Sequence, residues 1–188
     1  ALDAGGLTLA SVQDDAPYTY AGANGKSVNN YDRRYRGFTT LREAITDSIN
    51  IVTVKTLAQA GVSLGWQYVQ EYGFTTVDSR DMNEALALGG ITQGVSNLEL
   101  TAAYAAIANQ GTYIKPKFYT KILDHDGNVL IDNTTPESHT VIKDTTAWLL
   151  TSAMEDVMTS GTGTSAYFGS SMAQAGKSGT TTSSRDAL

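Results

Sequence analysis

Gly176-Lys177-Ser178 has residue types that could bind a phosphate, because backbone amides and a lysine can together neutralise an anion. The phosphate-binding loop Gly-x-x-x-x-Gly-Lys-[Ser/Thr] needs a first glycine at position 171, where this chain has Ser171. No strand pattern precedes the motif and no helical pattern follows it, so the sequence does not favour a nucleotide site. Gly161-Thr162-Gly163-Thr164-Ser165-Ala166 fits a dinucleotide fingerprint, but it follows a predicted helix and is better explained as a helix terminator.

Acidic and histidine side chains offer little further chemistry. Residues 124–128 alternate acidic and amide side chains as a calcium loop does, but the glycine comes one position early and Thr135 replaces the final glutamate. A hairpin turn explains this stretch better. His125 and His139 have no partners at metal-ligand spacing, and no Gly-x-Ser-x-Gly elbow indicates a serine hydrolase. We therefore expect no metal site and no bound cofactor.

Two further groups combine hydroxyl, amide and amine side chains at short spacing, namely Ser48-Ile49-Asn50 and Lys177-Ser178-Gly179-Thr180. Each group alone is a weak signal, because 25 threonines and 15 serines place a hydroxyl on 40 of the 188 residues. Taken singly, Ser48 could be a helix cap and Lys177 a surface lysine. The two groups indicate a functional site only when they are considered together and in this order.

Composition limits the classes of protein to which the chain can belong. Hydrophobic residues make up 41% and charged residues 17%, which is typical of a globular domain with its own core. Thirteen basic and nineteen acidic residues give a net charge of −6 without a basic run, so no nucleic-acid partner is expected. The absence of cysteine excludes disulfides and a cysteine nucleophile. No apolar run approaches the roughly 20 residues that cross a bilayer, so no membrane segment is expected in this chain.

The order of the predicted elements is helices, hairpin, helix and strand, which favours an α/β protein of the α+β type with an antiparallel sheet flanked by helices. Helical periodicity and capping-box spacing predict helices at 39–46, 51–60, 63–72, 96–108 and 144–159. The first two helices meet near Ser48. A hairpin is expected around Asp126-Gly127 and a strand within 172–181, while residues 1–37 look irregular.

Considered together, the groups at Ser48 and Lys177 match the second and third motifs of the penicillin-recognising serine acyltransferases. Nearly the whole chain resembles the transpeptidase domain of class A, bifunctional penicillin-binding proteins. Further segments carry this resemblance: Asn30-Tyr31-Asp32, Tyr35-Arg36-Gly37, Thr40–Ala44, Ala87–Gly90, Gly94-Val95, Leu98-Glu99, Ala103–Ala105, Gly161–Gly163 and Gly176–Thr181. The fold that it implies is that of penicillin-binding protein transpeptidases and serine β-lactamases.

One family motif is missing from the chain. No serine here has a lysine three residues later, whereas the family acylates the serine of a Ser-x-x-Lys motif. Thr112-Tyr113-Ile114-Lys115 has the spacing with the wrong nucleophile, and we expect it in a loop after a helix. By resemblance, the nucleophile falls shortly before residue 1 and further strands follow Leu188. We therefore expect residues 1–188 to be a partial transpeptidase domain, inactive alone and folded only with the remainder of its polypeptide.

The resemblance also implies a reaction. In the family, the serine attacks the carbonyl between two D-alanines of a peptidoglycan stem peptide, and an amine of a second stem peptide resolves the acyl-enzyme. β-Lactams mimic the substrate and leave a slow acyl-enzyme. By resemblance, Ser48 relays a proton at the leaving nitrogen, Asn50 holds the substrate amide and the missing lysine, and Lys177 supplies positive charge beside the substrate carboxylate.

The remaining motif residues would bind substrate. The resemblance implies that the Ser178 and Thr180 hydroxyls bind the substrate carboxylate and that the Thr180 N–H is an oxyanion donor. Gly179 fits because a side chain there would block substrate along the strand edge. The expected partners are stem peptides, β-lactams and the remainder of the polypeptide with its nucleophile segment, at the extracytoplasmic face of the bacterial cell membrane. A non-catalytic relative or binding module, and a nucleotide-binding protein, remain as alternatives.

Overall fold

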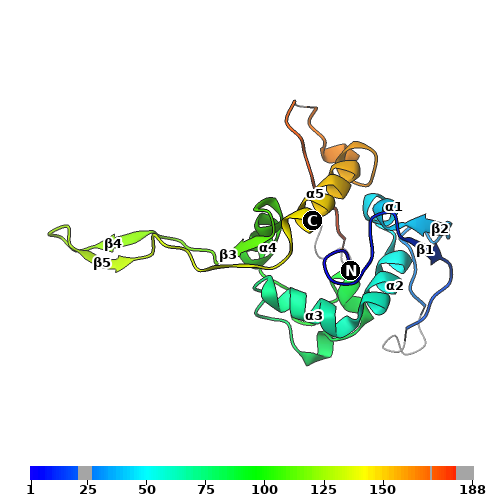
Figure 1. The fold of residues 1–188 in the computed structure, drawn as a ribbon, viewed down its shortest axis with the longest axis horizontal. Coiled ribbons are helices and arrows are strands. Elements are labelled where there is room, and N and C mark those ends of the chain that lie inside the picture. The colour runs from blue at the N-terminus through cyan, green and yellow to red at the C-terminus, as the bar shows by residue number, and fades with distance from the viewer. Residues whose placement is uncertain (21–26, 170, 181–188) are drawn as a thin grey trace.

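Helices arranged around the N-terminal residues dominate the computed structural model, which describes residues 1–20, 27–169 and 171–180 (Figure 1). The α-helices are α1 (Leu41–Thr46), α2 (Asn50–Ala60), α3 (Val62–Glu71), α4 (Asn97–Ala108) and α5 (Asp144–Thr159). Short 3₁₀ helices are η2 (Ser79–Asp81), η3 (Glu84–Leu88) and η4 (Thr164–Ala166). None of the helices in these described ranges is long and apolar enough to cross a bilayer.

The strands form antiparallel pairs, which confirms the predicted combination of antiparallel strands and flanking helices. Strands β1 (Val12–Asp15) and β2 (Gly37–Thr40) pair with Val12 opposite Thr40. β3 (Thr112–Ile114) pairs with β6 (Ser138–Thr140), and β4 (Lys121–Leu123) pairs with β5 (Val129–Asp132). In the described residues these are three separate two-stranded sheets and not one continuous sheet.

Local signals set the helix boundaries as predicted. The Thr40 hydroxyl accepts a hydrogen bond from the Glu43 N–H at 3.2 Å, and the Glu43 carboxylate accepts one from the Thr40 N–H at 2.8 Å. The same reciprocal capping box joins Ser96 and Glu99 at the start of α4. These bonds satisfy amide groups that a helix start leaves unpaired, and therefore fix where each helix begins.

Three sequence expectations are corrected by the strands. Residues 1–37 are not irregular throughout, because β1 lies within them. Residues 112–115 do not form a plain loop, because Thr112–Ile114 is strand β3. The expected strand within 172–181 is absent from the described residues 172–179, and Thr180 forms a single bridge. Each pairing depends on a distant partner that the local sequence does not reveal.

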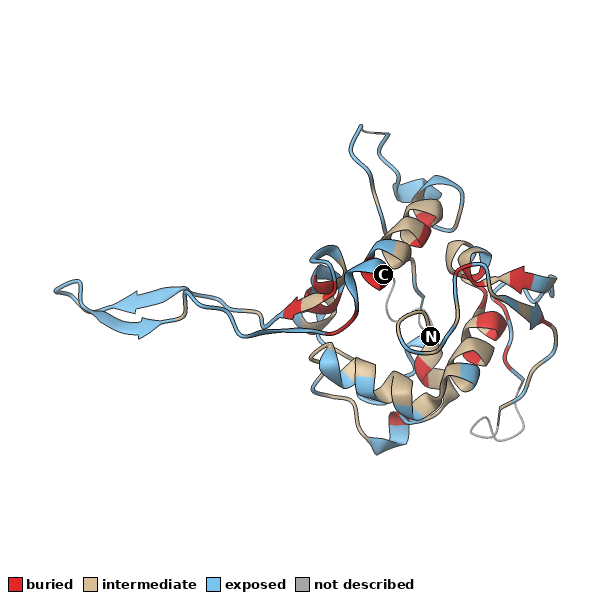
Figure 2. Cartoon of the chain, viewed as in Figure 1, coloured by how far each residue is buried: buried red, intermediate tan, exposed pale blue. Residues whose placement is uncertain are grey.

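Small apolar clusters hold the helices together. One lies between α1 and α2 and contains Leu41, Ala44, Ile49 and Val52. A larger cluster joins α4, β3, α5 and the segment before α5: Ala102, Ala106, Tyr113, Val141, Ile142 and Ala147. The β4–β5 hairpin extends from this body and is exposed along its length, as Figure 2 shows. Its turn carries Gly127 at φ +84°, a left-handed conformation that glycine adopts without strain, so the hairpin prediction is confirmed.

Candidate active site

Ser48 occupies the break between α1 and α2. Its φ is +57°, a left-handed conformation that costs a non-glycine residue roughly 1–2 kcal/mol. The next residue, Ile49, is buried, and its N–H donates to the Ala44 carbonyl at 2.9 Å. Ile49 is the N-cap of α2 and no side chain caps this helix, so the interpretation of Ser48 as a helix cap is wrong. The Ser48 hydroxyl instead accepts a hydrogen bond from another segment of the chain.

Lys177 meets this hydroxyl from a segment 129 residues away. Its Nζ donates to Ser48 Oγ at 2.7 Å and to the Ser178 carbonyl at 2.9 Å. The side chain is half-buried, and this burial lowers the pKa of Lys177 because a desolvated ammonium is less stable. Lys177 is therefore not a solvated surface lysine. An amine with weakened proton affinity on a serine hydroxyl is suited to moving a proton.

Ser178, Gly179 and Thr180 follow Lys177 toward the surface. The Ser178 hydroxyl oxygen lies 2.6 Å from the Thr162 hydroxyl oxygen. Gly179 and Thr180 are both exposed, so a ligand can reach their backbone and the Thr180 hydroxyl. The Ser178 carbonyl thus contacts the Lys177 amine, and the two residues that follow Ser178 are open to solvent.

Asn50 begins α2, but its carboxamide is turned toward another segment. Its Nδ2 donates to the Asn29 carbonyl at 2.9 Å. Among the described residues, no hydrogen bond joins Asn50 to Ser48 or Lys177. The structure therefore brings Ser48 and Lys177 into direct contact and places Asn50 two residues along the chain from that contact.

A buried polar network supports the start of α2. Asp15 is completely buried, and its carboxylate accepts hydrogen bonds from Asn30 Nδ2 at 2.8 and 2.9 Å. The Arg36 N–H also donates to this carboxylate, at 2.9 Å. Asn30 Oδ1 in turn accepts from the Ile51 N–H at 3.2 Å. The network ties β1 to the residue that follows Asn50, and so fixes the start of the helix.

Comparison with known proteins identifies the family of this chain. The family described as Penicillin binding protein transpeptidase domain matches residues 1–187. This chain belongs to the penicillin-binding protein transpeptidase family. The resemblance found in the sequence is thus confirmed.

Relatives of this transpeptidase chain are longer proteins. It is 40% identical over 152 residues to Penicillin-binding protein 1F of Bacillus subtilis, covering 81% of this chain and 20% of that protein. It is 34% identical over 179 residues to Penicillin-binding protein 1A of Streptococcus pneumoniae, covering 92% and 24%. The crystal structure of Penicillin-Binding Protein 1A from Haemophilus influenzae matches at TM-score 0.84 and 27% identity, covering 97% of this chain and 33% of that one. The chain thus spans about a fifth to a quarter of the curated relatives.

Fold similarity extends to more distant structures. The D,D-transpeptidase domain of a peptidoglycan glycosyltransferase from Eggerthella lenta matches at TM-score 0.75 and 20% identity, covering 96% of this chain and 50% of that one. At this identity the likeness shows the fold alone. The mixed helix and strand architecture expected from the motifs is therefore confirmed as a penicillin-binding transpeptidase fold.

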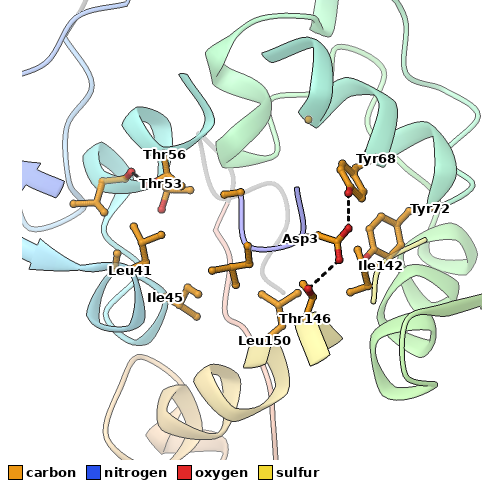
Figure 3. Close-up of a pocket in the computed structure, with 15 residues that line it drawn as sticks. Asp3, Leu41, Ile45, Thr53, Thr56, Tyr68, Tyr72, Ile142, Thr146 and Leu150 are labelled. Atoms are coloured by element: carbon orange, nitrogen blue, oxygen red, sulfur yellow. Dashed lines mark hydrogen bonds between the residues drawn. The ribbon is translucent and has the colours of Figure 1, made fainter. Parts of the chain in front are cut away.

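A cavity in the described part of this chain is separate from the polar site. It has a volume of about 330 Å³ and lies between the N-terminal residues and α1, α2, α3 and α5 (Figure 3). Aliphatic side chains from these elements and from the segment before α5 are among the lining residues: Leu41, Ile45, Val52, Ile142 and Leu150. Neither Ser48 nor Lys177 lines the cavity. It is therefore a mainly apolar space that the motif residues Ser48 and Lys177 do not line.

One polar group enters the cavity from the N-terminal segment. The Asp3 carboxylate accepts hydrogen bonds from the Tyr68 hydroxyl at 2.6 Å and from the Thr146 hydroxyl at 2.9 Å, as Figure 3 shows. The hydrogen bond to Asp3 raises the pKa of Tyr68 to about 12. The Lys143 N–H completes the set at 2.8 Å. These bonds attach the N-terminal residues to α3 and to the start of α5.

Sequence reasoning found Ser48 and Lys177 but missed their supports, Asp15 and Thr162. Asp15 carries no motif, and its burial becomes visible only when β1 is paired. Asn30 lies in a segment that resembles the family, which was an available signal for its importance. Thr162 lies between two glycines in another such segment, but among so many hydroxyls its contact with Ser178 could not be foreseen.

Proposed function

We propose that this chain is part of a peptidoglycan D,D-transpeptidase, which cross-links stem peptides through a serine acyl-enzyme and is acylated by β-lactams. The observation that carries the proposal is the 2.7 Å hydrogen bond from Lys177 Nζ to Ser48 Oγ. It joins two motifs that are far apart in the sequence into one proton-handling pair. Membership of the transpeptidase family supports the same conclusion.

Each motif residue has a role that its position favours. Ser48 passes a proton to the leaving nitrogen, since its hydroxyl is already hydrogen-bonded to an amine with a lowered pKa. Lys177 also attracts the carboxylate of the substrate, which the exposed Thr180 hydroxyl and the Ser178 hydroxyl bind. The Thr180 N–H faces the developing oxyanion, and Gly179 leaves the backbone open to the peptide. For Asn50 it is the family resemblance, and not its present bond to the Asn29 carbonyl, that supports a role in holding the substrate amide.

The attacking serine comes from the remainder of the polypeptide, because no serine in this sequence has a lysine three residues later. The relatives are about four to five times longer than the stretch they share with this chain, which leaves ample sequence for the nucleophile. The 330 Å³ apolar cavity is where we place part of that remainder. Filling it with apolar side chains would contribute roughly 25 cal/mol for each Å² removed from water. The chain alone should be inactive and poorly folded.

Membership of this family supports a location at the extracytoplasmic face of the bacterial cell membrane, where peptidoglycan is cross-linked. We propose that location for the parent protein, meaning the full polypeptide that carries this chain. Its substrates are stem peptides and its inhibitors are β-lactams.

The test is acylation of the parent protein by a fluorescent penicillin, followed by intact mass and peptide mapping. We expect one adduct, on a serine outside residues 1–188. Ser48→Ala should slow acylation by about 10²-fold or more, which is the usual contribution of a general acid or base. Ser63→Ala, at an exposed serine of α3, is the matched control and should leave the rate unchanged. Reversible binding without an adduct would indicate a binding module, and an adduct on a serine of this chain would refute the assignment.

A further inference from the structure

The loop that follows α5 contacts both halves of the site through one residue. Thr162 Oγ1 lies 2.6 Å from Ser178 Oγ, next to Lys177. The Thr162 N–H donates to the Thr46 carbonyl at 3.2 Å, at the end of α1 and two residues before Ser48. Thr162 therefore joins the Ser48 segment to the Lys177 segment by a backbone bond on one side and a hydroxyl contact on the other.

The glycines on either side of Thr162 allow this close approach. A Cβ on Gly161 would lie 2.2 Å from the Thr46 carbonyl oxygen, so only glycine fits there without displacing the end of α1. A Cβ on Gly163 would lie 2.8 Å from Met158 Sδ and 3.1 Å from the Val157 carbonyl oxygen. The Gly163 N–H donates to that same carbonyl at 2.9 Å. Thr162 is thus held from both sides by the end of α1 and the end of α5.

The protons available on the two hydroxyls limit the direction of the hydrogen bond between Thr162 and Ser178. A serine hydroxyl has one proton to donate and two lone pairs to accept with. If Ser178 donated to Thr162, its proton would be unavailable to an anion. If Thr162 donates to Ser178, the Ser178 proton is free, and the two hydroxyls and the anion form a chain of hydrogen bonds that polarise one another.

We propose that Thr162 is a positioning residue for substrate binding, which donates its hydroxyl proton to Ser178 Oγ and so directs the Ser178 proton toward the carboxylate of the substrate or β-lactam. This inference rests on the proposed function, because that function assigns the carboxylate to Ser178. The Thr162 N–H bond to Thr46 is independent of the side chain. Side-chain variants therefore test the hydroxyl and leave the backbone tie in place.

The experiment compares Thr162→Val with Thr162→Ser in the parent protein. Valine keeps the shape of threonine without the hydroxyl, and serine keeps the hydroxyl. Thr164→Val is the matched control, since Thr164 is an exposed threonine two residues along the chain. The measured quantities are the apparent dissociation constant and the limiting rate of acylation by a penicillin, and by the same penicillin as its carboxylate methyl ester.

We expect Thr162→Val to weaken binding of the penicillin about five- to tenfold, the effect of losing one hydrogen bond in a chain that ends on an anion. The limiting rate should change less than twofold, and Thr162→Ser and Thr164→Val should bind as the wild type does. The ester should show a smaller penalty in Thr162→Val, because it has no carboxylate charge to strengthen the hydrogen bond from Ser178. A general distortion of the site would weaken the acid and the ester equally.

The outcomes separate this inference from the proposed function. If the wild type is acylated and Thr162→Val binds both ligands as the wild type does, the role of Thr162 is refuted while the transpeptidase assignment stands. Equal weakening for the acid and the ester also refutes it. If the wild-type parent protein forms no adduct at all, the proposed function fails first.

Discussion

The substitution Asn30→Asp tests the buried network beneath the start of α2. Asn30 is only 4% exposed, and its Nδ2 donates to both carboxylate oxygens of Asp15 and, at 2.7 Å, to the Arg34 carbonyl. An aspartate at position 30 keeps the shape and the acceptor for the Ile51 N–H. It removes the donors and places a second carboxylate about 3 Å from the first, since the present bonds are 2.8 and 2.9 Å long.

The structure sets the size of the expected loss. Asn30→Asp removes the donor to a buried carboxylate and buries a second carboxylate beside it, and an uncompensated buried charge costs about 3–5 kcal/mol. The Arg36 N–H at 2.9 Å from Asp15 is retained, so the carboxylate is not left without any donor. We therefore expect the free energy of unfolding to fall by about 3–5 kcal/mol at pH 8. That is a large part of the roughly 5–15 kcal/mol that stabilises a typical domain.

Chemical denaturation of the parent protein between pH 8 and pH 5 is the assay. The penalty should be greatest at pH 8, because the unfolded variant releases both protons there, whereas the folded pair must either keep one proton or hold two like charges about 3 Å apart. It should shrink as the pH falls, because protonating one carboxyl restores a donor between them. The control is Asn29→Asp at the exposed neighbouring residue, whose side chain donates to the Ser27 carbonyl at 3.2 Å. This change should cost less than about 0.5 kcal/mol. Equal losses for the two variants, or a penalty for Asn30→Asp that is independent of pH, would refute the reasoning.

Other predictions concern charge, packing and capping. Lys177 should lose its proton at a lower pH than Lys115, because burial lowers the pKa of Lys177 while the hydrogen-bonded ion pair with Glu137 raises the pKa of Lys115. ¹³Cε chemical shifts of the lysine-labelled parent protein, followed over pH, would show the order. A reversed order would contradict the effect of burial on Lys177. The desolvation cost of charged Lys177 is present at neutral pH and disappears as the pH rises. Gly161→Ala should destabilise the parent protein by about 1–3 kcal/mol, because its Cβ meets the Thr46 carbonyl; an unchanged melting temperature would contradict this. Ser96→Ala should cost about 0.5–2 kcal/mol by removing the cap of α4, which chemical denaturation would measure.

Local chemistry explains which elements the sequence predicts well. The helix starts at Thr40 and Ser96 depend on residues three positions away, so the printed sequence contains the complete signal. The break at Ser48 was also visible, because the apolar spacing falters there. The boundaries of α4 and α5 follow from apolar periodicity in the same way.

The strands and the buried polar network around Asp15 depend on partners that lie far away in the sequence. β3 is three residues long, and it forms because Thr112 pairs with Thr140 across an inserted hairpin. β1 contains two aspartates, so its sequence resembles that of a loop. In the structure, Asn30 donates a hydrogen bond to buried Asp15 and so makes the strand possible. Such pairings have no local periodicity, so composition and spacing cannot reveal them.

The candidate site likewise has a part that local sequence predicts and a part that depends on distant partners. Motif order was enough to select Ser48 and Lys177, but it could not show that their side chains are in contact. That contact depends on Ser48 holding a left-handed backbone between two helices, a conformation that is unfavourable by itself. Ile49 and Ala44 both belong to the apolar cluster between α1 and α2. The burial of Ile49 and its hydrogen bond to the Ala44 carbonyl therefore offset this cost. The hydrogen bond between the Ser48 hydroxyl and Lys177 therefore depends on that cluster. Core substitutions between α1 and α2 should weaken this hydrogen bond, and so slow acylation of the parent protein, as well as lower its stability.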